Sequence, residues 1–281
     1  MIYTKKILIT GAGGFIGSRL FNSLKKKNCN VFGIDFDFLK DNKDLFDVNL
    51  VNEKQSKNLI NKINPSFVFH LAAYAGPPRN EENPQFARKY NVDLTLNLLK
   101  CLNKDTTIFF PSTDKIFEGL NYPDENTELK PTNVHGKLKL ECEELIRNYM
   151  KRHFIFRQPV VHAYGGHNQS TKMSGTGSFL DHSVDLIQNK KSVNIFSNVK
   201  RCFLKLDELI EVYEILLNSD KYGTYNLSSP MKSYYERLVE ICKNKKIDFD
   251  NYINSVDGKV NPLEQDINST KFKNNFNFNF S

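Results

Sequence analysis

The stretch that decides the fold is Thr10-Gly-Ala-Gly-Gly-Phe-Ile-Gly17, close to the N-terminus. It follows a β-branched apolar run, Lys5–Thr10, which is typical of a buried strand. It precedes Phe15–Lys27, in which apolar residues recur at helical spacing. The glycines therefore occupy a turn that leads from a predicted strand into a predicted helix.

The three glycines of this turn, Gly11, Gly14 and Gly17, have the spacing GxxGxxG. The first permits a tight turn, the second lets the backbone approach a pyrophosphate, and the third lets the helix pack closely on the strand. The N–H groups that open the helix, around Phe15 and Ile16, then face the phosphates, whose charge the helix dipole favours. The turn is therefore predicted to bind an adenine dinucleotide.

A carboxylate closes the next predicted strand, Asn30–Asp35, 18 residues after Gly17. At that place a carboxylate accepts hydrogen bonds from the adenosine ribose hydroxyls and repels a 2′-phosphate. Asp35 therefore favours NAD over NADP as the cofactor. Asp47 and Val48, at the end of the following strand, are expected either to border the adenine or to form a solvated turn.

Short apolar strands and helical stretches continue to alternate as far as residue 165. This order is typical of βαβ units, whose right-handed crossovers place helices on both faces of a parallel sheet. We therefore predict an α/β Rossmann fold with a doubly wound parallel sheet. The expected strands are residues 5–10, 30–35, 45–50, 67–71, 106–110 and 154–157, and the expected helices are residues 15–27, 53–62, 83–102 and 133–151.

The alternation becomes irregular after residue 165, where Gly165-Gly166 and Ser174–Gly177 indicate loops. Residues 1–165 are therefore predicted to form the dinucleotide-binding domain. Residues 166–281 are predicted to form mainly a smaller C-terminal substrate lobe, with some elements returning to the main sheet. The last ten residues, Phe272–Ser281, are expected to form a short edge segment or to fray.

Composition argues against several other classes of protein. With 281 residues, 40% hydrophobic and 25% charged, the chain is typical of a globular protein. It has no apolar run near the roughly 18 residues of a membrane helix and no signal-peptide core, so a soluble cytoplasmic protein is expected. Its net charge of +7 is spread along the chain, which argues against a nucleic-acid partner. The five cysteines form no CxxC pair, so neither disulfides nor a metal site is predicted.

Further motifs follow in one order along the chain. His70-Leu-Ala-Ala73 ends the fourth predicted strand, Asn91-Val92 lies in the long helix, and Pro111–Phe117 (PSTDKIF) comes at the end of the fifth strand. Arg201–Glu208 (RCFLKLDE) and Gly223–Leu227 (GTYNL) lie in the C-terminal part. Together with the glycine turn, these segments resemble the extended short-chain dehydrogenase/reductase family, which contains nucleotide-sugar epimerases, dehydratases and reductases. The resemblance covers nearly the whole chain.

The resemblance implies where the cofactor and the substrate bind. The diphosphate is expected to be held by Arg201, whose guanidinium can take two phosphate oxygens at once, unless it is a surface arginine. Arg79, in the loop after the fourth strand, is a weaker candidate to line the sugar pocket. The backbone after the fourth strand and a proline after the sixth are expected to lie along the cofactor: Leu71, Ala72, Ala73 and Pro159.

In that family a Ser/Thr, a Tyr and a Lys act together, with Tyr and Lys one helical turn apart in the pattern YxxxK. Thr113 matches the Ser/Thr, and Lys139 matches the Lys, which also holds the nicotinamide ribose. The Tyr position holds His135. Neutral imidazole accepts a proton near pH 7, whereas an ammonium group one turn away disfavours imidazolium. Three interpretations stay open: His135 is the acid/base, another group or a held water replaces it, or the redox chemistry is lost.

Asp114 and Lys115 directly follow Thr113. In the family's 4,6-dehydratases an acidic residue and a Glu or Lys at these places remove water across C5 and C6 of the sugar. A reductase branch has Ser-Thr-Asp before an aromatic residue and a glycine, which Phe117-Glu118-Gly119 resembles. The alternative is that neither residue is catalytic: Asp114 caps the loop and Lys115 points to solvent.

These residues predict an NAD-dependent epimerase or dehydratase that oxidises C4 of a nucleotide-diphosphate sugar by hydride transfer. One alternative is an NAD(P)H-dependent reductase of a 4-keto nucleotide sugar. Another is a catalytically impaired member that binds a dinucleotide or a nucleotide sugar. The resemblance also implies a homodimer, through residues 83–102 and the helix that carries His135. The identities of the nucleotide base and of the sugar stay open.

Overall fold

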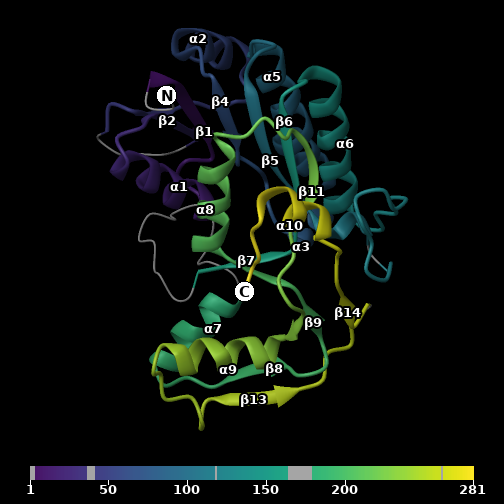
Figure 1. The fold of residues 1–281 in the computed structure, drawn as a ribbon. Coiled ribbons are helices and arrows are strands. Elements are labelled where there is room, and N and C mark those ends of the chain that lie inside the picture. Colours follow the sequence, from purple (N-terminus) through teal and green to yellow (C-terminus); the bar gives the residue numbers. More distant parts are fainter. Residues whose placement is uncertain (1–3, 37–41, 118, 164–178, 261) are drawn as a thin grey trace.

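A parallel sheet of seven strands forms the larger part of the protein (Figure 1). The computed structural model describes residues 4–36, 42–117, 119–163, 179–260 and 262–281. The strand order is β11-β6-β5-β4-β1-β2-β3, so the chain moves outward from β1 and then crosses to β4 on its other side. The strands are β1 (Lys6–Thr10), β2 (Asn30–Asp35), β3 (Leu45–Asp47), β4 (Phe67–His70), β5 (Thr107–Thr113), β6 (His153–Gln158) and β11 (Gly223–Asn226). The predicted Rossmann fold is confirmed, and its switch point lies between β1 and β4.

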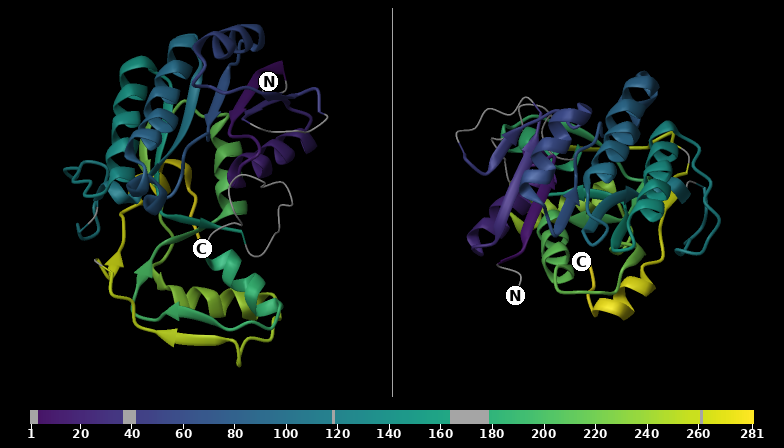
Figure 2. Two further views of the ribbon diagram at one scale, coloured as in Figure 1. Left: turned by 180° about the vertical axis from the view of Figure 1, so that it is seen from behind. Right: turned by 90° about the horizontal axis from the view of Figure 1, so that it is seen from above.

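Helices cover both faces of this sheet (Figures 1 and 2). Ile7 and Ile9 of β1 pack into one core with α1 (Phe15–Lys26) and α8 (Leu206–Leu216). Leu8, which points to the opposite face, packs into a second core. That core is completed by α2 (Glu53–Ile63), α5 (Leu94–Cys101) and α6 (Val134–Tyr149). None of the helices in the described ranges is long and apolar enough to cross a membrane.

The long helix predicted over residues 83–102 is interrupted. It consists of α4 (Pro84–Arg88), a π-helical turn (Lys89–Asp93) and α5. Two side-chain hydrogen bonds to backbone carbonyls accompany the wider turn: Asn91 Nδ2 donates to Ala87 O at 2.8 Å, and Thr95 Oγ1 donates to Asn91 O at 2.6 Å. The apolar spacing continues through the turn, so the sequence pattern alone did not reveal it.

The C-terminal half contributes to both parts of the molecule. β11 and α8 return to the main sheet, whereas the lobe has a separate core around α7 (Phe179–Gln188) and α9 (Tyr234–Asn244). The predicted boundary at residues 165 and 166 and the expected loop at Ser174–Gly177 lie outside the described residues. The lobe's strands pair as β7 (Val160–His162) with β10 (Phe203–Lys205), β8 (Val193–Phe196) with β13 (Ile253–Val256), and β9 (Lys200–Arg201) with β12 (Lys232–Ser233) and β14 (Glu264–Gln265).

The expectation that the tail frays is wrong, because it forms a short segment against β11, the edge strand of the main sheet. Helix α10 (Thr270–Phe276) packs against β11, and the side chains of Phe272 and Phe280 are only 1% and 4% exposed. Both belong to the core that contains Ile7. The Phe residues of this Asn-rich segment bury enough apolar surface to hold it on the domain.

Candidate active site

The carboxyl ends of β1 and β4 meet at one edge of the sheet. Thr10 ends β1 and His70 ends β4, and Thr10 Oγ1 lies 2.9 Å from His70 Nδ1. His70 Nε2 in turn lies 2.8 Å from Thr95 Oγ1 of α5. Burial, with a smaller effect from the charge of Lys139, lowers the pKa of His70 to about 3, so its ring is neutral. The two strand ends are thereby fixed side by side.

The glycine turn is built against this strand end. Gly11 has φ +70°, and a Cβ there would lie 2.7 Å from the backbone N of Ala72. A Cβ on Gly17 would lie 2.0 Å from the carbonyl O of Gly11. A Cβ on Gly14 would meet only that same oxygen, at 3.2 Å. Packing of the chain therefore requires glycine at positions 11 and 17, whereas a Cβ on Gly14 would be in close contact with a single backbone oxygen.

This difference gives a test of stability. We expect Gly17→Ala to lower the free energy of unfolding by about 1–3 kcal/mol, because a backbone atom must move to admit the methyl group. The matched control, Gly14→Ala, is expected to change it by less than about 1 kcal/mol. Urea unfolding of the two variants measures the difference. Equal losses in both would contradict this account of the turn.

Asp35 reaches back from β2 to the glycine turn. Its Oδ2 accepts a hydrogen bond from Gly13 N at 2.7 Å, and its Oδ1 accepts one from Phe36 N at 2.8 Å. Burial raises the pKa of Asp35, the two backbone N–H groups oppose this, and the charge of Asp47 adds to the rise. Asp47 is exposed, and Val48 donates its N–H to Asp35 O at 2.9 Å, so this pair lies next to Asp35.

The backbone after β4 is tied to the same place. Leu71 N donates to Thr10 O and Ala72 N donates to Thr10 Oγ1, both at 3.2 Å. Ala73, the next residue, is exposed. Pro159 is buried between β6 and β7. The residues expected along the cofactor therefore include a backbone segment that is fixed against the glycine turn.

Thr113 and Lys139 come from the end of β5 and from α6. Lys139 Nζ donates to Pro111 O at 2.7 Å and stands 4.4 Å from the centre of the Phe110 ring. Burial lowers the pKa of this ammonium group to about 8. Thr113 Oγ1 accepts a hydrogen bond from Lys115 N at 3.2 Å. The Lys139 side chain of α6 is thus held against β5, and the Thr113 side chain is held by the backbone that follows this strand.

His135 lies one turn before Lys139 on α6, and it contacts a residue that the sequence reasoning missed. Its Nδ1 is 2.9 Å from Oδ1 of Asn80, on the short helix α3 (Pro77–Glu82). Burial lowers the pKa of His135 to about 3, and the charges of Lys139 and Lys115 add to this. His135 is therefore neutral at physiological pH. Two prolines that favour a helix start were the signal for α3.

Asp114 and Lys115 begin a 3₁₀ helix (Asp114–Phe117). Lys115 Nζ donates to Oε1 of Gln265 on β14 at 2.8 Å, so this side chain does not simply point to solvent. Thr113 Oγ1 donates to Asp114 Oδ1 at 3.3 Å. Burial raises the pKa of Asp114, while the charges of Lys115 and Arg201 oppose the rise. The carboxyl group of Asp114 and the ammonium group of Lys115 therefore follow Thr113 directly, in surroundings from which water is partly excluded.

Much of the guanidinium of Arg201 is engaged by the protein. Nη1 donates to Lys200 O at 2.7 Å and to Leu263 O at 2.8 Å, and Nη2 donates to Pro262 O at 2.8 Å. Arg201 is thus not a surface arginine, since only 8% of it is exposed. Arg79 is exposed and stacks on Tyr74, with 4.3 Å between Cζ and the ring centre. Neither arrangement tests the predicted contacts with substrate.

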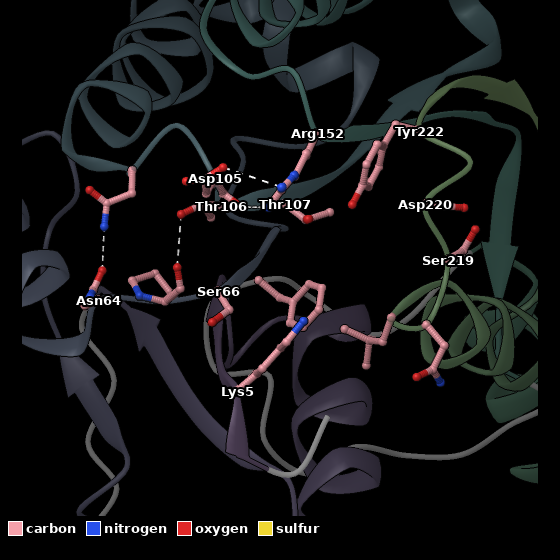
Figure 3. Close-up of a pocket in the computed structure, with 15 residues that line it drawn as sticks. Lys5, Asn64, Ser66, Asp105, Thr106, Thr107, Arg152, Ser219, Asp220 and Tyr222 are labelled. Atoms are coloured by element: carbon pink, nitrogen blue, oxygen red, sulfur yellow. Dashed lines mark hydrogen bonds and ion pairs between the residues drawn. The ribbon is translucent and has the colours of Figure 1, made fainter. Parts of the chain in front are cut away.

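A cavity of about 670 Å³ lies at the opposite edge of the sheet (Figure 3). Its walls come from the residues that precede β1, β4, β5, β6 and β11, among them Lys5, Asp105, Arg152 and Tyr222. Arg152 faces Asp105, with 3.5 Å between Nη2 and Oδ1. Ligands of open α/β sheets bind at the carboxyl ends of the strands. This cavity is therefore separate from the candidate active site.

Comparison with known proteins agrees with this geometry. Residues 5–197 match the family described as the RmlD substrate binding domain. The chain belongs to this family. The RmlD family lies within the extended short-chain dehydrogenases/reductases, so the resemblance stated from the motifs is confirmed. Similar proteins include, by their names, a dTDP-4-dehydrorhamnose reductase, a UDP-glucose 4-epimerase and a dTDP-D-glucose 4,6-dehydratase.

Two curated relatives of this RmlD-family chain differ in activity. It is 29% identical over 160 residues to the methionine adenosyltransferase 2 subunit beta of Xenopus tropicalis, which covers 56% of this chain and 47% of the relative. It is 26% identical over 265 residues to the dTDP-D-glucose 4,6-dehydratase of Dictyostelium discoideum, and this match covers 81% of this chain and 59% of the relative. The chain thus spans about half the length of the first of these relatives.

A solved structure shows the same fold over nearly the whole chain. This is the dTDP-4-dehydrorhamnose reductase of Bacillus anthracis in complex with NADP, which superimposes with a TM-score of 0.82. The match covers 98% of this chain and 93% of the reductase chain. The two sequences are 19% identical. At that identity the match establishes the fold of this RmlD-family protein, and its reaction must be argued from the site.

Proposed function

We propose that this protein is an NAD-dependent enzyme that oxidises the C4 hydroxyl of a nucleotide-diphosphate sugar and so acts as an epimerase or a dehydratase. The observation that carries the proposal is the environment of His135. Its ring is neutral, one nitrogen faces Asn80, and Lys139 lies one turn further along α6. A neutral imidazole carries a lone pair that can accept a proton, whereas the buried cation beside it makes the ring a weak base.

The residues around the glycine turn fit a dinucleotide. Gly14 is partly exposed where the N–H groups of the first turn of α1 begin. Each carboxylate oxygen of Asp35 accepts one backbone hydrogen bond and keeps a lone pair for a ribose hydroxyl. A 2′-phosphate would meet this carboxylate. The turn therefore favours NAD over NADP.

Bound NAD supplies an acceptor for the hydride from the sugar carbon and a donor for its return. The chain's own residues supply orientation and proton transfer. Lys139, with a pKa of about 8, carries its charge at pH 7 and is placed to hold the nicotinamide ribose. The Thr113 hydroxyl orients the sugar oxygen, and the free nitrogen of His135 takes the proton from it.

The protonation state of His135 bears on which proton transfer can come first. Reduction of a 4-keto sugar needs a proton to deliver, but with a pKa of about 3 only about 10⁻⁴ of the imidazole is protonated at pH 7. Oxidation needs a base, which the neutral ring provides. The imidazolium that forms is then a strong acid and returns the proton readily. The neutral ring is in the form that an internal cycle starting with oxidation needs first, and the preference for NAD at Asp35 supports the same cycle.

Asp114 and Lys115 provide the acid and base that a dehydratase requires. Burial raises the pKa of Asp114, so this carboxyl group keeps its proton more readily than an exposed one. Lys115 is positioned through its hydrogen bond to Gln265. Elimination of water across C5 and C6 of the sugar needs one group to protonate the leaving hydroxyl and another to remove the C5 proton.

Two measurements on the purified protein test this proposal. We expect denatured protein to release NAD, and incubation with UDP-, dTDP-, GDP- and CDP-sugars to give a C4 epimer or a 4-keto-6-deoxy sugar by NMR, with no net consumption of cofactor. Added NAD should also raise the melting temperature of cofactor-free protein more than NADP does. Steady oxidation of NADPH with a 4-keto sugar would contradict the proposal.

A second candidate function is binding without turnover. It is favoured by the replacement of the usual Tyr with a weakly basic histidine, and by a relative whose name describes a subunit of another enzyme. In that case the nucleotide-sugar panel would give melting-temperature shifts but no product. The two candidates therefore separate in the same experiment.

A further inference from the structure

We propose that Asn80 is a positioning residue, whose amide holds His135 in the Nδ1–H tautomer and thereby makes Nε2 the proton-accepting atom. Its consequence for turnover rests on the function proposed above. The tautomer itself is a property of the protein without substrate, so it is tested separately.

The orientation of the Asn80 amide follows from its other contact. Nδ2 donates to the carbonyl O of Tyr74 at 2.8 Å. If the amide were turned over, its oxygen would face that carbonyl, and two acceptors would meet. Asn80 is completely buried, so water is not available to separate them. The amide oxygen of Asn80 must therefore face His135.

The tautomer of His135 follows from that oxygen. Oδ1 of Asn80 lies 2.9 Å from Nδ1 of the ring, and an amide oxygen only accepts hydrogen bonds. Nδ1 must then carry the hydrogen. A neutral imidazole has one N–H and one bare nitrogen, so Nε2 has the lone pair. The opposite tautomer would bring two lone pairs together in a buried contact.

The surrounding structure holds Asn80 in place. Its backbone N donates to Gly76 O at 3.1 Å, and the carbonyl of Tyr74 also accepts from Asn91 Nδ2 at 3.2 Å. Glu81, the next residue on α3, accepts a hydrogen bond from Val134 N at 2.6 Å. The short helix is thus fixed both to the loop after β4 and to the first residue of α6.

The charged groups around the ring act in one direction. Lys139, on α6, and Lys115, on the 3₁₀ helix, both disfavour imidazolium. The carboxylate of Glu81 on α3 is engaged by Val134 N. The ring therefore stays neutral, and the hydrogen bond to Asn80 decides which nitrogen is free.

This requirement is specific to histidine. The oxygen of a tyrosine hydroxyl both donates and accepts hydrogen bonds. The tyrosine that is usual in this family therefore has no tautomers and needs no partner to select one. An imidazole presents either a lone pair or an N–H to the substrate, and only the first can accept a proton. Asn80 therefore supplies a function that the replacement of Tyr by His makes necessary.

Nitrogen-15 NMR of the full chain, with labelled histidine, tests the tautomer directly. We expect His135, assigned by the loss of its signals in His135→Gln, to show a protonated Nδ1 and a bare Nε2 between about pH 5 and 8. In Asn80→Ala we expect the Nε2–H tautomer to appear. A protonated Nε2 in the unmodified protein, or an unchanged tautomer in Asn80→Ala, would overturn the proposal. The spectrum of the unmodified protein decides even if the variant does not fold.

Turnover supplies the second test, through a double-mutant cycle. We expect Asn80→Ala to lower kcat at least about tenfold in the natural background, with little change in KM, and to have a much smaller effect on kcat in the His135→Tyr background. Equal effects in both backgrounds would mean that Asn80 is only structural. The matched control, Asn83→Ala, removes the side-chain cap of α4 on the same segment and should leave kcat and the tautomer unchanged. The expected tautomer without any turnover would support the role of Asn80 and refute the proposed function.

Discussion

Turnover of the nucleotide sugar is expected to fall by roughly 10²–10⁴-fold in His135→Ala, because the variant loses the group that accepts the proton. The pH dependence of kcat/KM in the natural protein should also reflect the ionisation of His135 and Lys139. With a pKa of about 3 for His135, no acid limb is expected above about pH 5. Activity should decline as pH rises through about 8, where Lys139 loses its positive charge.

The control for this prediction is cofactor binding. His135 lies on α6, away from Asp35 and the glycine turn, so His135→Ala should keep its melting-temperature shift with NAD. An active His135→Ala variant would show that another group accepts the proton. If the natural protein has no activity and His135→Tyr gains it, binding without turnover is the better account.

The second large effect concerns a buried charge beneath the site. Glu143 of α6 is completely buried and accepts hydrogen bonds from Arg157 Nη2 at 3.0 Å and from Ser112 Oγ at 2.5 Å. Arg157→Ala would leave this carboxylate without its buried cation. We expect the free energy of unfolding to fall by about 3–5 kcal/mol, measured by urea unfolding at pH 7.

Arg147→Ala is the matched control for that variant. Arg147 Nη1 pairs with the same carboxylate at 3.0 Å, but its side chain is 34% exposed and water replaces much of the interaction. A loss of no more than about 1 kcal/mol is expected. Equal losses in the two variants would show that the buried contact stabilises the protein no more than the exposed one. Because Ser112 precedes Thr113, the Arg157 variant should also weaken turnover.

The sequence by itself determined the fold and most of the site. Alternating strands and helices predict a parallel sheet, because a helix between two strands returns the chain so that the second strand runs in the same direction as the first. The glycine turn follows from local geometry, since φ +70° at Gly11 and the close approach at Gly17 exclude side chains. The order of the motifs led to the family, and the spacing of Thr113, His135 and Lys139 led to the candidate catalytic group.

Only the tertiary structure decided which partners these residues have. Asn80 meets His135 across 55 positions, and Lys115 meets Gln265 across 150. The tail folds onto the core through Phe272, although its composition suggested fraying. Such contacts depend on how distant segments pack, and local periodicity carries no information about that. The protonation of His135 is therefore a tertiary property, because burial and the neighbouring side chains set it.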